Sequence, residues 1–221
     1  MKSHYTVNQK EQQFMNCFIS SDPDFLQAVF DHMPEKIILH SERVRDISNI
    51  MTEYMSADLL PNEMNLDSYR LALSKGAYYH DIGVYLAGND VERRPAAAEK
   101  LLTELGYMDI LLPFGNVVFE TVRSCCERYD GKGYPGGLIA EKIPFHASLC
   151  AIADAVDMMM GSKNKKVKSV ADYIRRNSGI LFRPDAVRCF EMAEKEIFDV
   201  YKQYEAGDNV NREHVLKSIA K

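Results

Sequence analysis

Residues 34–54 read PEKIILHSERVRDISNIMTEY, and this stretch predicts the architecture of the whole chain. Its apolar side chains recur at steps of three and four residues, which is the pattern of a helix with one buried face. The positions on this face are Ile37, Ile38, Val44, Ile47, Ile50, Met51 and Tyr54. We therefore expect a long amphipathic helix here, packed against a hydrophobic core.

Helical periodicity continues along most of the remaining sequence, and no segment alternates convincingly as a strand would. Further helices are expected at 66–80, 95–105, 113–128, 145–160, 168–177 and 184–204. Pro95 and Gly106 suit the first turn and the end of the second of these helices. The turn-rich run 129–144 interrupts the pattern as one glycine-rich loop. The sequence thus predicts an all-α fold.

Length and composition indicate one medium-sized domain with additional elements. The chain has 221 residues, of which 46% are hydrophobic, enough to bury a core without disulfides. We place the main helical domain at residues 35–205. Residues 1–34 would form an N-terminal helical extension, packed on that domain or available to a protein partner or a second copy. Residues 206–221 would add a short C-terminal helix.

The net charge argues against two classes of binding partner, and the cysteine content indicates the cellular compartment. There are 27 basic and 32 acidic residues, a net charge of −5, whereas DNA and anionic membranes attract basic proteins. We therefore expect no DNA partner and no membrane partner, and the sequence shows neither a signal peptide nor an unbroken apolar span of about 18 residues.

The five cysteines are odd in number and two are adjacent, which favours a reducing, cytoplasmic setting.

Histidine and aspartate residues on separate predicted helices form a candidate metal site. His80 and Asp81 are adjacent near the end of one helix, His40 lies in an earlier helix and Asp154 in a later one. Imidazole nitrogen and carboxylate oxygen together suit Mn²⁺, Fe²⁺ or Zn²⁺, and several helices can direct such groups to one point in a bundle. His40 by itself would equally suit a hydrogen-bonded position in the core.

A resemblance to a known family supports the metal site. The order His40, His80-Asp81, Asp154 and the run ERYDGKGYP at 127–135 are similar to the HD-GYP branch of the HD superfamily of metal-dependent phosphohydrolases, over roughly residues 35–200. The resemblance implies an HD-domain helical bundle with one glycine-rich GYP loop. It also implies bacterial cyclic di-GMP signalling, in which the messenger is hydrolysed to pGpG or GMP at a site of two or three metals.

The resemblance further implies roles for a basic segment and for the loop. Lys163 and Lys166 match basic positions that hold the phosphates of the ligand. The residues that would form the GYP loop are Asp130, Gly131, Gly133, Tyr134 and Pro135. These glycines and this proline are also ordinary turn formers, and the lysines would also suit a solvated loop.

Several positions depart from the family pattern. Cys125 and Cys126 stand where the family has two histidines, and Arg94 stands where it has the histidine of a His-Pro pair. Val84 replaces a lysine and Lys36 replaces a glutamate. These losses remove ligands for a second and third metal but keep those for one. We therefore expect one divalent transition metal, held by the two histidines and two aspartates named above.

The substituted residues allow two interpretations each. Cys125 and Cys126 could be altered metal ligands for Zn²⁺ or Fe²⁺, or small buried hydrophobic residues. The second interpretation is favoured, because both cysteines fall in the predicted helix 113–128, where adjacent side chains point about 100° apart. Arg94 would repel a second cation, and it could also bind a phosphate oxygen.

Two functions are compatible with this pattern. The first is a divergent, single-metal phosphohydrolase in which Asp81 is the catalytic carboxylate as well as a ligand, and whose substrate is a cyclic dinucleotide or a smaller phosphoester. The second is an inactive relative that binds a nucleotide or a regulatory protein.

Two further charged residues lie near the predicted ligands in the sequence. Asp157, one turn after Asp154, is expected to support helix packing or to orient a metal ligand, and Arg43 is expected to form an ion pair.

Overall fold

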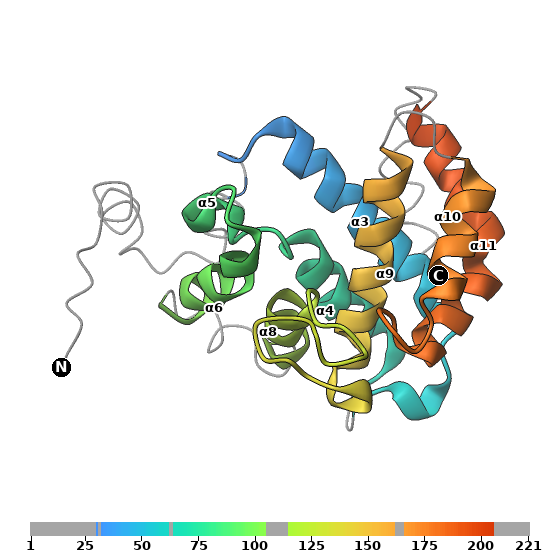
Figure 1. Ribbon diagram of the computed structural model, residues 1–221, viewed down its shortest axis with the longest axis horizontal. Helices are drawn as coiled ribbons and strands as arrows, with labels where there is room; N and C mark the ends of the chain where they lie inside the picture. Colours follow the sequence, from blue (N-terminus) through green and yellow to red (C-terminus); the bar gives the residue numbers. More distant parts are fainter. Residues whose placement is uncertain (1–29, 31, 62–63, 105–114, 162–165, 206–221) are drawn as a thin grey trace.

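The computed structural model describes residues 30, 32–61, 64–104, 115–161 and 166–205 (Figure 1). The predicted helix at 206–221 lies outside these residues, as does most of the predicted extension at 1–34. Within the described ranges every regular element is helical, and pairing of extended backbone is limited to two isolated bridges. The all-α prediction is confirmed.

The described helices follow the predicted order along the chain. They are α3 (Glu35–Thr52), α4 (Leu66–Tyr78), α5 (Val84–Ala87), α6 (Arg94–Glu104), α8 (Gly115–Ser124), α9 (Phe145–Met160), α10 (Val167–Arg176) and α11 (Pro184–Glu205). Single 3₁₀ turns, η1 (Ala57–Leu59), η2 (Val91–Arg93) and η3 (Ala140–Lys142), occur in the connections. No helix in the described ranges is both long and apolar enough to cross a bilayer.

Helix α9 lies at the centre of the bundle, as Figure 1 shows. It packs against α3, α8, α10 and α11, while α4 joins α3 to α8 and the short α5 and α6 lie on the α8 side. Leu149, Ile152 and Val156 of α9 are fully buried. Each such side chain stabilises the fold by about 1.5–3 kcal/mol through removal of its surface from water. This packing sets α3 against both α4 and α9, and the candidate ligands lie on α3, on α9 and in the turn that follows α4.

Two local features differ from the prediction. Helix α8 ends at Ser124 instead of continuing to residue 128, so Cys125 and Cys126 lie in a turn. The single-turn helix Val84–Ala87 was not predicted, because four residues between two glycines are too short to show a helical period. Both differences occur beside the candidate site.

Candidate metal centre

The structure brings the four predicted ligands together. His40, His80 and Asp154 each offer one donor atom, and these atoms lie within 4.8 Å of one another. Asp81 Oδ2 lies 3.9 Å from Nε2 of His40 and 4.0 Å from Nε2 of His80. His40 comes from α3, Asp154 from α9, and the other two from the turn after α4. The group therefore depends on the packing of three helices.

The His80 imidazole is held with one nitrogen available. Its side chain is 3% exposed, and Nδ1 lies 2.7 Å from the carbonyl oxygen of Ala77. This contact assigns the proton to Nδ1, because a carbonyl oxygen can only accept, and it leaves a lone pair on Nε2. Nε2 is buried and has no hydrogen-bond partner among the residues that the structure describes. A buried nitrogen without a partner is costly in a folded protein, and a metal ion would satisfy it.

The His40 imidazole bridges two carboxylates. Nε2 lies 3.2 Å from Oδ1 of Asp154, and Nδ1 lies 2.7 Å from Oδ2 of Asp157. Burial lowers the pKa of His40, but the hydrogen bonds to Asp154 and Asp157 outweigh it and raise the pKa to about 10. Asp157 thus orients the ring through Nδ1, so that Nε2 faces the other ligands.

The donor set fits a divalent transition metal. Two imidazoles and two carboxylates provide nitrogen and oxygen donors, once His40 has released a proton to the solvent on metal binding. The two carboxylate charges then balance one divalent cation. The carboxylate of Asp157 also lies nearby, but both of its oxygens already accept hydrogen bonds from Arg43, at 2.5 Å to Oδ1 and 3.1 Å to Oδ2. The predicted ion pair of Arg43 is thereby confirmed. His40, His80, Asp81 and Asp154 are the residues that would hold the metal.

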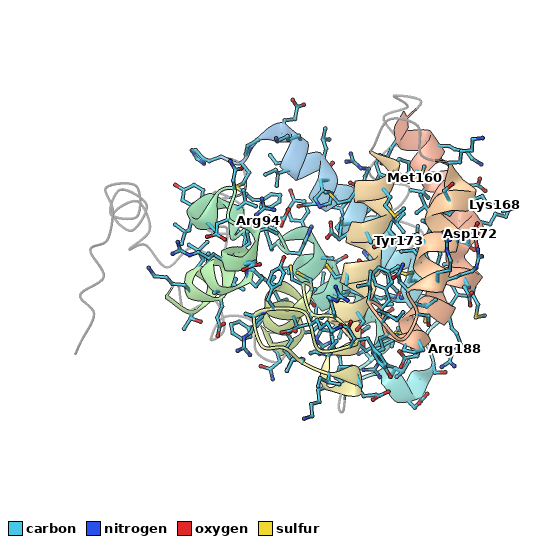
Figure 2. The ribbon with its side chains drawn as sticks, in the orientation of Figure 1. Arg94, Met160, Lys168, Asp172, Tyr173 and Arg188 are labelled. Atoms are coloured by element: carbon cyan, nitrogen blue, oxygen red, sulfur yellow. The ribbon has the colours of Figure 1, made fainter. Side chains whose placement is uncertain are left out.

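Arg94 lies at the edge of this group. Its Nη1 is 3.8 Å from Oδ1 of Asp81, and its side chain is one-quarter exposed. Gly83 makes this approach possible, since a Cβ at that position would lie 2.0 Å from the carbonyl oxygen of Arg94. Figure 2 shows Arg94 on the α5–α6 side of the molecule, across from Lys168 on α10. A cation at the rim of the site suits a phosphate ligand.

The two adjacent cysteines also reach this region. Their sulfur atoms are 3.9 Å apart. The Cys125 thiol donates to the carbonyl oxygen of Val122, with 3.6 Å between sulfur and oxygen. Cys125 and burial raise the pKa of Cys126 above its ordinary value. Cys126 lowers the pKa of Cys125, but Cys150 and burial raise it more.

The predicted loop is organised by a residue that the sequence analysis did not single out. Glu127 is 4% exposed, and its carboxylate accepts hydrogen bonds from the backbone N–H groups of Gly136 at 2.6 Å and Leu138 at 3.0 Å. Gly133 packs directly on this segment, because a Cβ there would lie 2.2 Å from the nitrogen of Arg128. A glutamate just before a glycine-rich run was the signal available, since a buried carboxylate must find donors.

The other loop residues have structural partners. Arg128 donates two hydrogen bonds to Asp130, at 3.0 and 2.7 Å, and this contact lowers the pKa of Asp130. Gly131 adopts a φ of 77°, and the peptide bond between Tyr134 and Pro135 is cis. Asp130 therefore shapes the loop, while Tyr134 is the loop side chain that reaches Cys126.

The remaining predicted residues lie away from the four ligands or outside the described chain. Lys166 is exposed at the N-terminus of α10, and Lys163 lies outside the described residues. His146, which fitted no part of the pattern, is buried with Nε2 3.0 Å from Glu120 and its ring beside Tyr69. The structure thus separates this histidine from the candidate metal ligands.

Comparisons with known proteins agree with the fold and the site. Residues 89–184 match the family described as HD domain. A cyclic di-GMP phosphodiesterase of Thermotoga maritima is 39% identical over 95 residues, 40% of this chain and 26% of that protein. The cyclic di-GMP phosphodiesterase response regulator RpfG of Xanthomonas campestris pv. campestris is 33% identical over 82 residues, 35% of this chain and 22% of that protein.

The chain spans about a quarter of the length of these curated relatives. The HD match begins after His80 and Asp81 and includes Asp154, and the structure adds His40 through the packing of α3 on α9. The matches over part of the chain and the all-α fold support an HD-GYP-like protein of the HD superfamily.

Proposed function

We propose that this chain is a divergent metal-dependent phosphohydrolase with one metal site. The observation that carries the proposal is the buried, unpartnered Nε2 of His80, which faces His40 Nε2 and the Asp81 carboxylate. The cation would be Mn²⁺, Fe²⁺ or Zn²⁺. When bound, it supplies Lewis-acid chemistry that polarises a phosphoryl oxygen and lowers the pKa of water.

The proposed reaction is attack of water on the phosphorus of a phosphodiester, with cleavage of one P–O bond. Arg94 would hold a phosphate oxygen at the rim of the site, where its guanidinium is partly exposed and close to Asp81. Asp81 would serve as ligand and as the carboxylate nearest this phosphate. Asp157 would keep the proton on Nδ1 of His40, so that Nε2 stays directed at the site. Lys163 and Lys166 would contact further phosphate oxygens.

The proposed substrate is cyclic di-GMP or a smaller phosphoester. Support comes from the two relatives, both named as cyclic di-GMP phosphodiesterases. An inactive relative that binds a nucleotide or a protein is less well supported, because His40, His80 and Asp154 keep donor atoms within 4.8 Å of one another. A cytoplasmic location is proposed on the basis of the free cysteines. A regulatory partner and a homodimer stay predictions.

Metal content and turnover test the proposal together. The full chain, purified without added metal, is analysed by inductively coupled plasma mass spectrometry and then incubated with cyclic di-GMP and Mn²⁺. We expect about one metal ion per chain at the four-ligand site, and linear products on chromatography. His80→Ala should lose both the metal and the turnover, because it removes the nitrogen that has no other partner.

His32→Ala is the matched control, since it removes an exposed histidine outside the site. It should keep both properties. Metal content that is unchanged in His80→Ala would contradict the assigned ligands. Full metal loading without turnover of cyclic di-GMP, of linear dinucleotides or of small phosphomonoesters would contradict the hydrolase proposal itself.

A further inference from the structure

An aromatic cluster lies directly before the candidate ligands His80 and Asp81 in the chain. Tyr78 is the last residue of α4, and Tyr79 follows it immediately ahead of His80. The Phe30 ring packs on both tyrosines, with its centroid 4.6 Å from that of Tyr78 and 5.4 Å from that of Tyr79. Phe30 is fully buried, and Tyr79 is 8% exposed. A residue from before α3 thus holds the segment that leads into two of the ligands.

Phe30 is also tied to the start of α3, the helix that carries His40. Its carbonyl oxygen accepts a hydrogen bond from the backbone N–H of Met33 at 2.9 Å, just before α3 begins, and Met33 is itself buried. The imidazole rings of His40 and His80 face each other with 5.1 Å between their centroids. Phe30 therefore joins the beginning of α3 to the end of α4, the two elements that bring these histidines together.

Tyr79 controls the direction of the turn that carries the ligands. Its backbone N–H donates to the carbonyl oxygen of Lys75 at 3.0 Å, and its own carbonyl oxygen accepts from the N–H of Ile82 at 2.9 Å. One planar peptide unit joins Tyr79 to His80, so a tyrosine ring that cannot turn limits the rotation of that unit. Metal binding requires donor atoms placed to within about 0.2 Å, and the packing of Phe30 on Tyr79 provides such a constraint.

We propose that Phe30 is a positioning residue for the metal centre, because it fixes Tyr78 and Tyr79 and, through them, the adjacent His80 and Asp81. The inference rests on the proposed metal site and adds to it a residue that precedes all the helices supplying ligands. A change that draws Phe30 off the tyrosines lowers the metal affinity. Metal binding in turn holds Phe30 in place, since coupling between two sites is reciprocal.

Metal affinity, compared with folding stability, tests this role. Phe30→Leu keeps an apolar side chain but loses both ring contacts. Phe190→Leu is the matched control, because Phe190 is equally buried and packs edge-on against Phe198 within α11. Both variants should lose stability to urea. We expect the Kd for Mn²⁺, from electron paramagnetic resonance of the free ion, to rise about tenfold in Phe30→Leu and to stay the same in Phe190→Leu. The visible spectrum of bound Co²⁺, which reports ligand geometry, should change in Phe30→Leu alone.

A measurement on the wild-type chain covers the case in which Phe30→Leu does not fold. Mn²⁺ should slow hydrogen exchange about tenfold at the amide of Met33, which donates to Phe30, and at the amide of Ile82, which donates to Tyr79. The amide of Gly179, which donates within the turn between α10 and α11, should exchange at the same rate with and without Mn²⁺. Nuclear magnetic resonance resolves the three amides.

The outcomes separate this role from the proposed reaction, since none of the readouts uses turnover. An unchanged Kd in a folded Phe30→Leu, an equal rise in Phe190→Leu, or exchange at Met33 that does not respond to Mn²⁺ would each overturn the proposal. A chain whose Mn²⁺ affinity depends on Phe30 but which hydrolyses no phosphoester would contradict the phosphohydrolase and support the positioning role.

Discussion

The Nδ1 atom of His40 lies 2.7 Å from Oδ2 of Asp157, although 117 positions separate the two residues in the sequence. Asp157 is 3% exposed, and its carboxylate also accepts from Arg43. Burial raises the pKa of Asp157, but hydrogen bonds from His40 and Arg43 outweigh it and lower the pKa. Asp157, which lies outside the candidate donor group, thus sets the orientation of His40, one of its members.

Replacement of this carboxylate should weaken metal binding. Asp157→Asn keeps the shape of the side chain but loses its charge, so His40 and Arg43 are held less firmly. We expect the affinity for Mn²⁺ to fall about 10–100-fold, measured by isothermal titration calorimetry. Asp199→Asn is the matched control, because Asp199 is an exposed carboxylate on α11 paired with Lys202. Equal affinities of both variants would refute the orienting role of Asp157.

Arg94 should contribute to substrate binding and not to metal binding. Arg94→Ala removes a charge-assisted contact worth about 1.5–3 kcal/mol, so KM for cyclic di-GMP should rise roughly 10–100-fold. Metal content should stay the same. Arg94→Lys should have an intermediate effect, because an ammonium cannot form the bidentate contact. The control is Arg93→Ala, whose side chain is 68% exposed and pairs with Asp90. A loss of metal in Arg94→Ala would contradict this division of roles.

Gly83 should be sensitive to any added side chain. In Gly83→Ala the new Cβ would meet the carbonyl oxygen of Arg94, so α6 must move away from the turn that carries Asp81. We expect a loss of about 1–3 kcal/mol in the free energy of unfolding, measured by urea denaturation, together with a higher KM. At Gly179 the added Cβ meets no neighbouring atom, and its φ of 76° adds only local backbone strain. Gly179→Ala should therefore leave KM unchanged, and a rise in KM there would argue against the steric explanation.

The carboxylate of Glu127 should hold the loop in place. Glu127→Gln puts an amide N–H₂ where one of two backbone N–H groups needs an acceptor, at a cost of about 1–3 kcal/mol in stability. Hydrogen exchange at the amides of Gly136 and Leu138 should accelerate, as followed by mass spectrometry. Glu141→Gln provides the comparison within the same loop, since the Glu141 carboxylate accepts from the hydroxyl of Tyr129 and not from Gly136 or Leu138. Unchanged exchange in Glu127→Gln would exclude this anchoring.

Thiol reactivity should depend on pH in a defined direction. Burial raises the pKa of Cys189 to about 11, and the pKa of Cys126 is raised further. Only the thiolate reacts, so alkylation of each should be slow at pH 7 and rise about tenfold per pH unit. The rate at Cys189 should level off above pH 11 while that at Cys126 continues to rise. Peptide mass spectrometry after iodoacetamide treatment measures both rates, and a fast reaction of Cys126 at pH 7 would disagree with its buried, protonated state.

Local sequence patterns determined most of the fold. The helix expected at 66–80 runs from Leu66 to Tyr78, and the one expected at 184–204 runs from Pro184 to Glu205. Apolar periodicity and flanking turn residues act over a few residues, so they can be read directly from the chain. The four candidate ligands were also identified by residue type and order. The end of α8 was misplaced, because no glycine or proline marks the turn at Cys125 and Cys126.

Only the tertiary structure decided how these residues act together. The sequence placed His40 and Asp157 on different helices, but the packing of α3 on α9 made one orient the other. It similarly brought Gly83 against the backbone of Arg94. Such contacts depend on which helix faces meet and at what register. The sequence therefore determined the helices and the donor atoms, while long-range packing determined the geometry of the site.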